Sequence, residues 1–294
     1  MRIPSLGILI ISLFGLLGSC RSWSPPAPPV PLAVKIRFLL TFDDGPSVRT
    51  DYNPTLSVLG QLSANDVQNG VKGIFFVQTR NSNGGGSEAG KNIMRQTYAQ
   101  GHVLGLHSAE PSGHVRHTHM ERAQLNQSLT NGKLDIKRIT GSNPEFVRPP
   151  DWAFDAVTQE LYQANGLKML LSDVKARDGV IHVFNVSLRR RSHIRSELRE
   201  VYEAISRYQL PQVHDVVPVI VSFHDVNTFT ASHLSEYLHI LVEEAANAGL
   251  PLAEKPFFDT TPELVEAARY RAILPVYPDG RKPTAKTRVR LSPG

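Results

Sequence analysis

Residues 34–46, VKIRFLLTFDDGP, join an apolar run to two adjacent carboxylates and a Gly-Pro turn. A short apolar run rich in Val, Ile and Leu is typical of a buried strand. Similar runs follow at 71–77, 102–106, 168–172 and 217–223, and helical stretches separate them at 55–63, 90–99, 120–139, 156–164, 192–207 and 232–248. This alternation predicts an α/β fold with a parallel sheet or a (β/α)-type barrel.

The composition excludes several classes of protein. Of the 294 residues, 41% are hydrophobic and 20% are charged, which excludes disorder of the whole chain. The excess of Lys and Arg over Asp and Glu, 32 − 27 = +5, is too small to indicate a nucleic-acid partner, and we predict none. The single cysteine excludes an internal disulfide framework and a Cys-rich zinc site.

The amino terminus resembles the export signal of a bacterial lipoprotein. Arg2 precedes an apolar run at 6–17, which is shorter than the roughly 20 residues of a membrane span and fits a secretory signal. The junction Leu17-Gly18-Ser19-Cys20 resembles a lipobox, in which the cysteine is acylated and becomes the first residue. We therefore predict a lipoprotein signal peptide at 1–19. A plain cleaved signal peptide with an incidental cysteine is the alternative.

The two ends of the mature chain are expected to be extended. Residues 20–33 are rich in proline and predict a semi-rigid tether behind an acylated Cys20 in a lipid bilayer. Residues 278–294 contain five Lys or Arg and three Pro, and they predict a disordered basic tail. We expect an exported, lipid-anchored protein of the bacterial cell envelope, in the periplasm or at the outer membrane. Residues 81–87, NSNGGGS, predict a flexible surface loop.

Candidate chemistry gathers where strands end. Asp43 and Asp44 follow the first strand, at the position where α/β barrels place active sites. Five of the 11 histidines lie between positions 102 and 119. Imidazoles beside a carboxylate form Zn²⁺ sites, although a polar helix start with exposed histidines is the alternative for any one of them. Arg148 precedes two prolines, and His224 ends the apolar run at 217–223.

These segments together resemble the polysaccharide deacetylases of carbohydrate esterase family 4, the NodB-homology domain. Residues 41–46, TFDDGP, reproduce the first family motif without change. Further likenesses follow in order at IFFV (74–77), GHVLGLHS (101–108), RPP (148–150) and SFHD (222–225). The resemblance implies a distorted (β/α) barrel of the polysaccharide deacetylase type, with the catalytic domain at 34–277.

The resemblance also implies roles for individual residues. The metal ligands would be Asp44, His107 and His114. Asp43 would be the general base that takes a proton from water, and His224 the general acid that protonates the leaving group.

Further residues would support these groups, again by resemblance. Arg148 would pair with Asp43, and Asp178 would orient His224. The backbone amide of Asp151 would help to hold the oxyanion.

The second motif departs from the family pattern. The family has a second histidine four residues after the first, where this chain has Pro111. The ligand must come from His114 or His117, and on an unbroken helix seven residues would rise about 10.5 Å, too far for one metal. Pro111 and Gly113 are therefore expected to break the helix. We assign His114 by counting back from residues 139–141 at the usual helix length, and His117 is the rival.

The fourth motif is also altered. The family pattern Asp-x-x-Asp-Trp is reduced here to residues 175–179, KARDG, in which only Asp178 matches. Asp173 is an alternative to it. The missing tryptophan removes one apolar wall of the acetyl pocket. Trp152, where the family has glycine, would reshape the substrate-binding surface or serve as a core aromatic.

The predicted function is metal-dependent removal of acetyl groups from a polysaccharide. The most favoured substrates are N-acetylglucosamine residues of peptidoglycan, poly-N-acetylglucosamine or chitin-type chains, and an O-acetyl xylan esterase is an alternative. The cofactor is expected to be Zn²⁺, with Co²⁺ or Ni²⁺ as alternatives. A non-catalytic glycan-binding envelope lipoprotein and a small-molecule amidase are the other readings.

Overall fold

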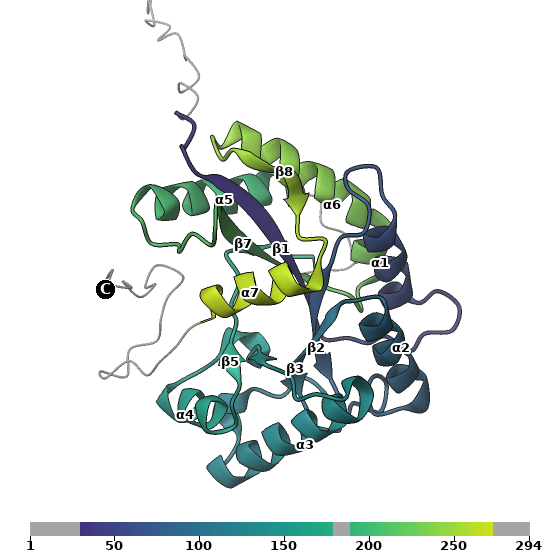
Figure 1. The fold of residues 1–294 in the computed structure, drawn as a ribbon. Coiled ribbons are helices and arrows are strands. Elements are labelled where there is room, and N and C mark those ends of the chain that lie inside the picture. Colours follow the sequence, from purple (N-terminus) through teal and green to yellow (C-terminus); the bar gives the residue numbers. More distant parts are fainter. Residues whose placement is uncertain (1–29, 179–188, 273–294) are drawn as a thin grey trace, which may run out of the picture.

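The computed structural model of the chain describes residues 30–178 and 189–272 (Figure 1). The predicted signal peptide, Cys20, most of the tether and the basic tail lie outside the described residues. Within the described tether, Val30 is exposed, and its carbonyl accepts a hydrogen bond from the Tyr202 hydroxyl. The described helices include none that is both long and apolar enough to cross a membrane.

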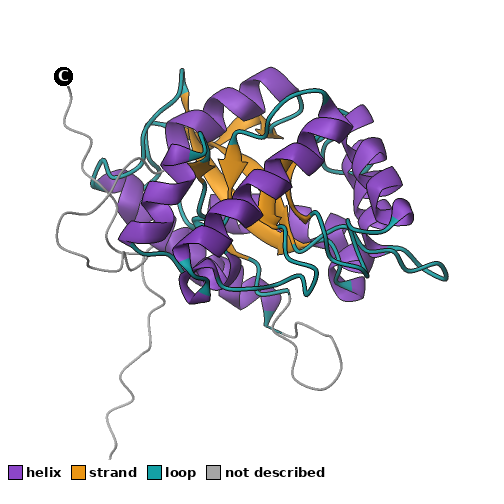
Figure 2. Ribbon diagram, turned by 90° about the horizontal axis from the view of Figure 1, so that it is seen from below, coloured by secondary structure: helices purple, strands orange, loops and turns teal. Residues whose placement is uncertain are grey.

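A single parallel sheet organises the fold (Figure 2). Its strands run β5-β4-β3-β2-β1-β7-β6, and β8 pairs with the first half of β1. Their bounds are β1 Lys35–Asp43, β2 Gly73–Gln78, β3 Val103–Ser108, β4 Phe146–Val147, β5 Lys168–Met169, β6 Val174–Lys175, β7 Val216–His224 and β8 Leu252–Phe257. The sheet is curled into a half-barrel, which confirms the predicted α/β fold with a parallel sheet.

Helices connect the strands and cover the sheet. Their bounds are α1 Pro54–Ser63, α2 Glu88–Ala99, α3 Arg122–Thr140, α4 Ala156–Ala164, α5 Arg190–Ser206, α6 Thr228–Asn247 and α7 Thr261–Arg271. Two short 3₁₀ turns lie at η1 His117–His119 and η2 Pro150–Trp152. The predicted helices agree with α1 to α6 within a few residues at each end.

Both faces of the sheet are buried, as expected for a parallel sheet. Phe38, Leu40 and Phe42 of β1 pack into the larger core beneath α1 to α6. The alternate residue Leu39 packs into a second core, which includes Leu264 of α7. Figure 1 shows α7 lying across the sheet. Because side chains alternate along a strand, Thr41 and Asp43 belong to the same face as Leu39.

The strand register brings the chemistry-bearing residues to one edge. Asp43 at the end of β1 lies opposite His224 at the end of β7, and opposite Phe76 in β2. His107 is in β3, and Arg148 directly follows β4. All of these strands are parallel, so their carboxyl ends meet at the same edge.

The structure differs from the sequence prediction in four elements and one loop. Strands β4, β6 and β8 and helix α7 were not predicted. The loop at 81–87 is packed rather than free: Gly84 and Gly85 are buried, and a Cβ on Gly85 would lie 2.6 Å from the Gln78 carbonyl oxygen. The glycines in this loop allow a close approach of backbone to backbone.

Candidate active site

A buried ion pair stands at the centre of the site. Arg148 Nη1 donates to Asp43 Oδ1 over 2.8 Å, and both side chains are at most 4% exposed. The same nitrogen donates to the Thr41 hydroxyl at 2.6 Å. The guanidinium stacks on the Phe76 ring, with 4.3 Å from Cζ to the ring centroid. The Asp43 carboxylate is thereby fixed in direction next to a permanent positive charge.

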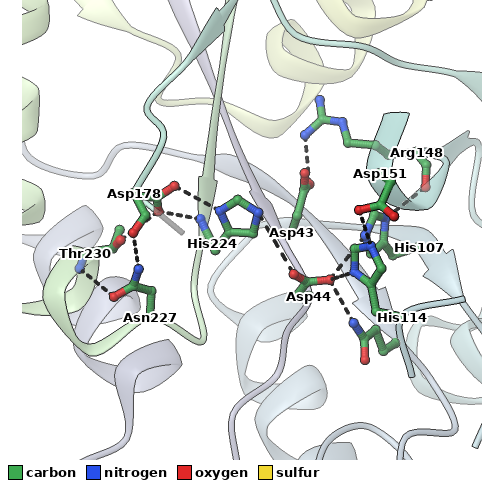
Figure 3. A network of polar contacts seen from close by, with 11 residues as sticks. Asp43, Asp44, His107, His114, Arg148, Asp151, Asp178, His224, Asn227 and Thr230 are labelled. Carbon is green, nitrogen blue, oxygen red and sulfur yellow. Dashed lines mark hydrogen bonds and ion pairs between the residues drawn. The ribbon is translucent and has the colours of Figure 1, made fainter. Parts of the chain in front are cut away.

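Asp44, His107 and His114 form a candidate metal site (Figure 3). Asp44 Oδ1 lies 3.2 Å from His107 Nε2 and 2.8 Å from His114 Nδ1. One ligand atom from each residue lies within 4.8 Å of the others. Burial raises the pKa of Asp44, but hydrogen bonds from the two imidazoles outweigh it and hold that pKa far below its usual range.

The donor set fits a divalent transition metal. One carboxylate and two imidazoles are ligands that Zn²⁺, Co²⁺ and Ni²⁺ accept, and three protein ligands leave positions open for water or substrate. His107 Nδ1 faces the Arg148 carbonyl oxygen at 2.8 Å, which leaves Nε2 for the ligand side. A backbone carbonyl behind the imidazole is the usual outer contact of a ligating histidine.

His114 and His117 occupy different environments. His114 lies on the loop that Pro111 and Gly113 turn ahead of α3, as predicted, and its side chain is 37% exposed. His117 is buried, and its Nδ1 lies 2.6 Å from the Tyr162 hydroxyl in α4. Burial lowers the pKa of His117 to about 3. The structure thus brings His114, and not His117, to Asp44 and His107.

A second dyad flanks the carboxylates on the opposite side, as Figure 3 shows. His224 Nδ1 lies 2.9 Å from Asp178 Oδ1, and the His224 amide donates to Oδ2 of the same carboxylate at 2.7 Å. Burial lowers the pKa of His224, but the charge and hydrogen bond of Asp178, together with the charges of Asp43 and Asp44, outweigh it and raise that pKa to about 10. Asp173, the alternative to Asp178, instead forms a buried ion pair with Arg271 of α7.

Asp151 and Trp152 lie in the η2 turn beside the candidate metal site. Asp151 Oδ1 is 3.1 Å from His114 Nε2, and Arg116 Nε donates to Oδ2 at 2.5 Å. Trp152 is half-buried, and its ring lies between the Arg148 guanidinium at 4.8 Å and the Lys175 ammonium at 4.7 Å. The Trp152 ring is thus partly exposed and contacts two positively charged side chains.

Unusual backbone conformations gather around these residues. Among the described residues, six other than glycine have positive φ, and four of them are Asp44, Asp151, Trp152 and Arg177. Left-handed conformations cost side-chain-bearing residues free energy, and they cluster at functional sites. The surrounding structure therefore holds the backbone of these residues in conformations that cost free energy, and these conformations set the directions of their side chains.

Sequence reasoning missed several residues that hold the site. Gln78, at the end of β2, donates from Nε2 to Asp44 Oδ1 at 2.8 Å. The Thr230 hydroxyl donates to Asp178 Oδ2 at 2.6 Å, and Asn227 Nδ2 donates to the Asp178 carbonyl oxygen. Gln78 follows the motif at 74–77, and Asn227 and Thr230 follow the motif at 222–225. Their closeness to a strand end is the sequence feature that could have indicated them.

Comparison with known proteins agrees with these features. Residues 34–170 match the family model described as Polysaccharide deacetylase. This match, just under half of the chain, identifies residues 34–170 as part of a polysaccharide deacetylase domain. The domain is that of carbohydrate esterase family 4, a family of hydrolases, and the predicted resemblance is confirmed.

A curated relative covers part of the chain. A chitin deacetylase of Pestalotiopsis sp is 26% identical over 141 residues, which are 48% of this chain and 43% of that protein. The alignment thus spans less than half the length of that deacetylase.

Solved structures share the fold. A chitin deacetylase from Colletotrichum lindemuthianum matches with a TM-score of 0.55 and 21% identity, covering 81% of this chain and 90% of that one. A family 4 acetyl xylan esterase from Clostridium thermocellum, in complex with a cobalt ion, matches with a TM-score of 0.51 and 21% identity, over 78% and 90%. Other matches include a peptidoglycan deacetylase from Bacillus subtilis and a mutant of a family pseudoenzyme with restored activity.

Proposed function

We propose that this polysaccharide deacetylase family member is an active metal-dependent hydrolase that removes acetyl groups from N-acetylglucosamine residues of a cell-envelope or extracellular polysaccharide. The observation that carries the proposal is the joint placement of a three-ligand donor set with two proton-transfer groups. Asp44, the second carboxylate of the motif, is a metal ligand. Asp43, the first, is not a ligand and can therefore accept a proton. In this role Asp44, His107 and His114 hold Zn²⁺, with Co²⁺ or Ni²⁺ as alternatives.

Asp43 is proposed as the general base. When bound, the divalent metal supplies Lewis acidity, which polarises a carbonyl oxygen and acidifies a water molecule. The Asp43 carboxylate accepts a proton from the attacking water, whose oxygen bonds to the acetyl carbon. Arg148 holds Oδ1 of Asp43 at 2.8 Å, so the carboxylate keeps its direction during the transfer.

His224 is proposed as the general acid. Its Nδ1 donates to Asp178, so Nε2 faces the reacting groups and carries the proton to be delivered. The raised pKa of His224, about 10, keeps the imidazole protonated at neutral pH. As the C–N bond breaks, the leaving nitrogen takes this proton, and acetate and a free amine are the products. The Asp151 amide is proposed to donate to the developing oxyanion.

The substrate proposal rests on the relatives. The chitin and peptidoglycan deacetylases among them point to N-acetylglucosamine polymers. The acetyl xylan esterase keeps O-acetyl xylan as an alternative, since the same attack of water serves esters. Trp152 offers a partly exposed ring at the site, on which a sugar ring can pack.

A non-catalytic glycan-binding protein is the second candidate. Its support is the altered second and fourth motifs, together with the presence of a pseudoenzyme in the family. Metal content separates the two candidates, because a binder without a metal site would purify free of metal.

The test is acetate release from N-acetylglucosamine oligomers and from acetylated xylan by the full chain. The assay is repeated after chelation and after Zn²⁺ is added back. Asp43→Asn is expected to lower the rate by about 10²–10⁴-fold with zinc binding retained. Asp66→Asn, at an exposed aspartate on another face, is the control. No acetate from any acetylated glycan, despite bound zinc, would contradict the proposal, and an inactive, metal-free protein would favour the binder.

The cellular location is also a proposal. We infer that the protein is exported and held in the bacterial envelope through an acylated Cys20, with 20–33 as the tether. The support is the lipobox-like junction at 17–20. In a detergent phase-partitioning experiment, the wild-type protein is expected in the detergent phase and the Cys20→Ala variant in the aqueous phase. Equal partitioning of the two forms would favour a plain cleaved signal peptide.

A further inference from the structure

The two histidines of the candidate metal site are held in different ways. His107 lies in strand β3, and its side chain is 3% exposed. His114 lies on the loop between β3 and α3, with a side chain that is 37% exposed. A partly exposed side chain on a loop has rotamer freedom that it must give up to hold a ligand in one geometry. Something other than packing has to fix the direction of the His114 imidazole.

Both imidazoles use their two nitrogens in the same pattern. One nitrogen of each faces Asp44 Oδ1, namely Nε2 of His107 and Nδ1 of His114. The other nitrogen faces an oxygen acceptor, which for His107 is the Arg148 carbonyl oxygen at 2.8 Å. For His114 it is Asp151 Oδ1 at 3.1 Å. A carboxylate or carbonyl in this position fixes the tautomer and orientation of a ligating histidine.

Asp151 is itself held from the same loop. Arg116, two residues after His114, donates from Nε to Asp151 Oδ2 at 2.5 Å. One carboxylate oxygen thus faces the histidine and the other faces the arginine. Asp151 has φ of 55°, a left-handed conformation that costs a non-glycine residue free energy, and this conformation accompanies both contacts.

The loop that carries His114 also packs closely against two polar side chains, Gln78 and Asn81. Gly113, with φ of 83°, lies so close to Gln78 and Asn81 that a Cβ there would be 2.5 Å from Gln78 Oε1 and 2.6 Å from Asn81 Nδ2. Asn81 Nδ2 donates to Gln78 Oε1, and Gln78 Nε2 donates to Asp44. The loop is therefore packed at Gly113, and Asp151 contacts the imidazole of His114 on the same loop.

We propose that Asp151 is the positioning residue of the loop-borne ligand His114, and that Arg116 holds Asp151 for this task. The pair supplies the orientation that a ligand on a helix or strand receives from its element. This inference rests on the proposed function, because it takes Asp44, His107 and His114 to hold a metal.

The test measures the affinity of the full chain for Zn²⁺ alone, by competition with a chromophoric chelator. Asp151→Ala is expected to weaken binding by about 10–100-fold, the usual effect of losing such an outer contact. Asp151→Asn is expected to recover part of this loss, because its carbonyl oxygen still accepts from Nε2 of His114. Arg116→Ala should weaken binding less than Asp151→Ala.

The control is Arg122→Ala, which breaks an exposed ion pair with Glu160 on neighbouring helices. It should leave the affinity for zinc unchanged. Unfolding of the metal-free variants by denaturant separates a loss of folding from a loss of orientation. Wild-type affinity in a folded Asp151→Ala protein would overturn this inference and leave the proposed function standing. A wild-type chain that binds no zinc would contradict both.

Discussion

Oδ1 of Asp44 lies 2.8 Å from Nδ1 of His114, although 70 positions separate the two residues in the chain. Asp44 comes directly after β1, and His114 reaches it from a loop rather than from helix α3, which begins at Arg122. Pro111 and Gly113 explain this path, since proline ends a helix and Gly113 takes a left-handed conformation. The second histidine of the candidate metal site is thus supplied by the loop at 111–116 and not by a helix.

Replacing His114 and His117 in turn tests this arrangement. His114→Ala is expected to weaken zinc binding by at least 100-fold, because loss of a ligand exceeds the roughly 10–100-fold effect of losing an outer contact. His117→Ala should keep wild-type zinc affinity but lower the free energy of unfolding by about 2–4 kcal/mol. It leaves a buried cavity and removes the hydrogen bond between His117 and the Tyr162 hydroxyl. Chelator competition and urea unfolding measure the two quantities. The reverse pattern would make His117 the ligand.

Asp178→Asn tests the second dyad. Asparagine keeps the volume but removes the charge that faces His224, so kcat should fall by about 10²–10⁴-fold while zinc affinity is retained. Asp173→Asn is the matched control, since Asp173 is equally buried but pairs with Arg271. It should cost about 3–5 kcal/mol of stability and leave kcat within a few-fold of wild type. An equal loss of kcat in both variants would remove the special role of Asp178.

Strand-end residues could be predicted from the sequence because their positions follow from topology. Asp43, His107 and His224 each end or follow an apolar run that predicts a strand, and parallel strands bring their carboxyl ends together. Arg148 follows β4, which was not predicted, and only the motif at 148–150 indicated it. The contact of Asp151 with His114 could not be predicted in this way. It depends on the left-handed backbone at Asp151 and on the path of a loop with no periodicity.

The elements that were missed carry weak local signals. Helix α7 buries Leu264, Ala267 and Ala268, so its contact face is made mostly of small residues and shows little apolar periodicity. Strands β4 and β6 have two residues each, too short for any alternation. Strand β8 has a half-exposed pattern with charged residues in its centre. Tertiary packing, and not local pattern, defines these elements.

His102 predicts a pH dependence of stability. Burial lowers the pKa of His102 to about 3, and Gly73 donates its amide to Nδ1 at 3.1 Å. The unfolded chain binds a proton near pH 6.5 and the folded chain does not until near pH 3. The free energy of unfolding is therefore highest above pH 6.5 and falls as the pH drops.

The variant His102→Asn removes this titration while keeping an acceptor for Gly73. Between pH 7 and pH 5, its free energy of unfolding should change by about 1–2 kcal/mol less than that of the wild type. Urea unfolding at both pH values measures the difference. His119→Asn, at an exposed histidine, is the control. The same pH dependence in wild type and His102→Asn would show that His102 does not contribute.

Gly132 in α3 allows the helix to approach strand β3 closely. The contact is with Leu106, the residue before His107. A Cβ at position 132 would lie 2.4 Å from Leu106 Cδ1 and 3.1 Å from the Ala109 Cβ. Gly132→Ala is therefore expected to lower the free energy of unfolding by about 1–3 kcal/mol through overpacking, even though alanine favours a helix by up to about 1 kcal/mol.

Gly60 provides the matched comparison for Gly132. It lies in helix α1, is exposed, and an added Cβ would meet nothing within 4 Å. Gly60→Ala should thus raise the free energy of unfolding by up to about 1 kcal/mol, because only the helix preference changes. Opposite signs for the two substitutions in urea unfolding would establish that close packing, and not helix preference, requires Gly132. A stabilising effect of both would mean that Leu106 moves aside at no cost.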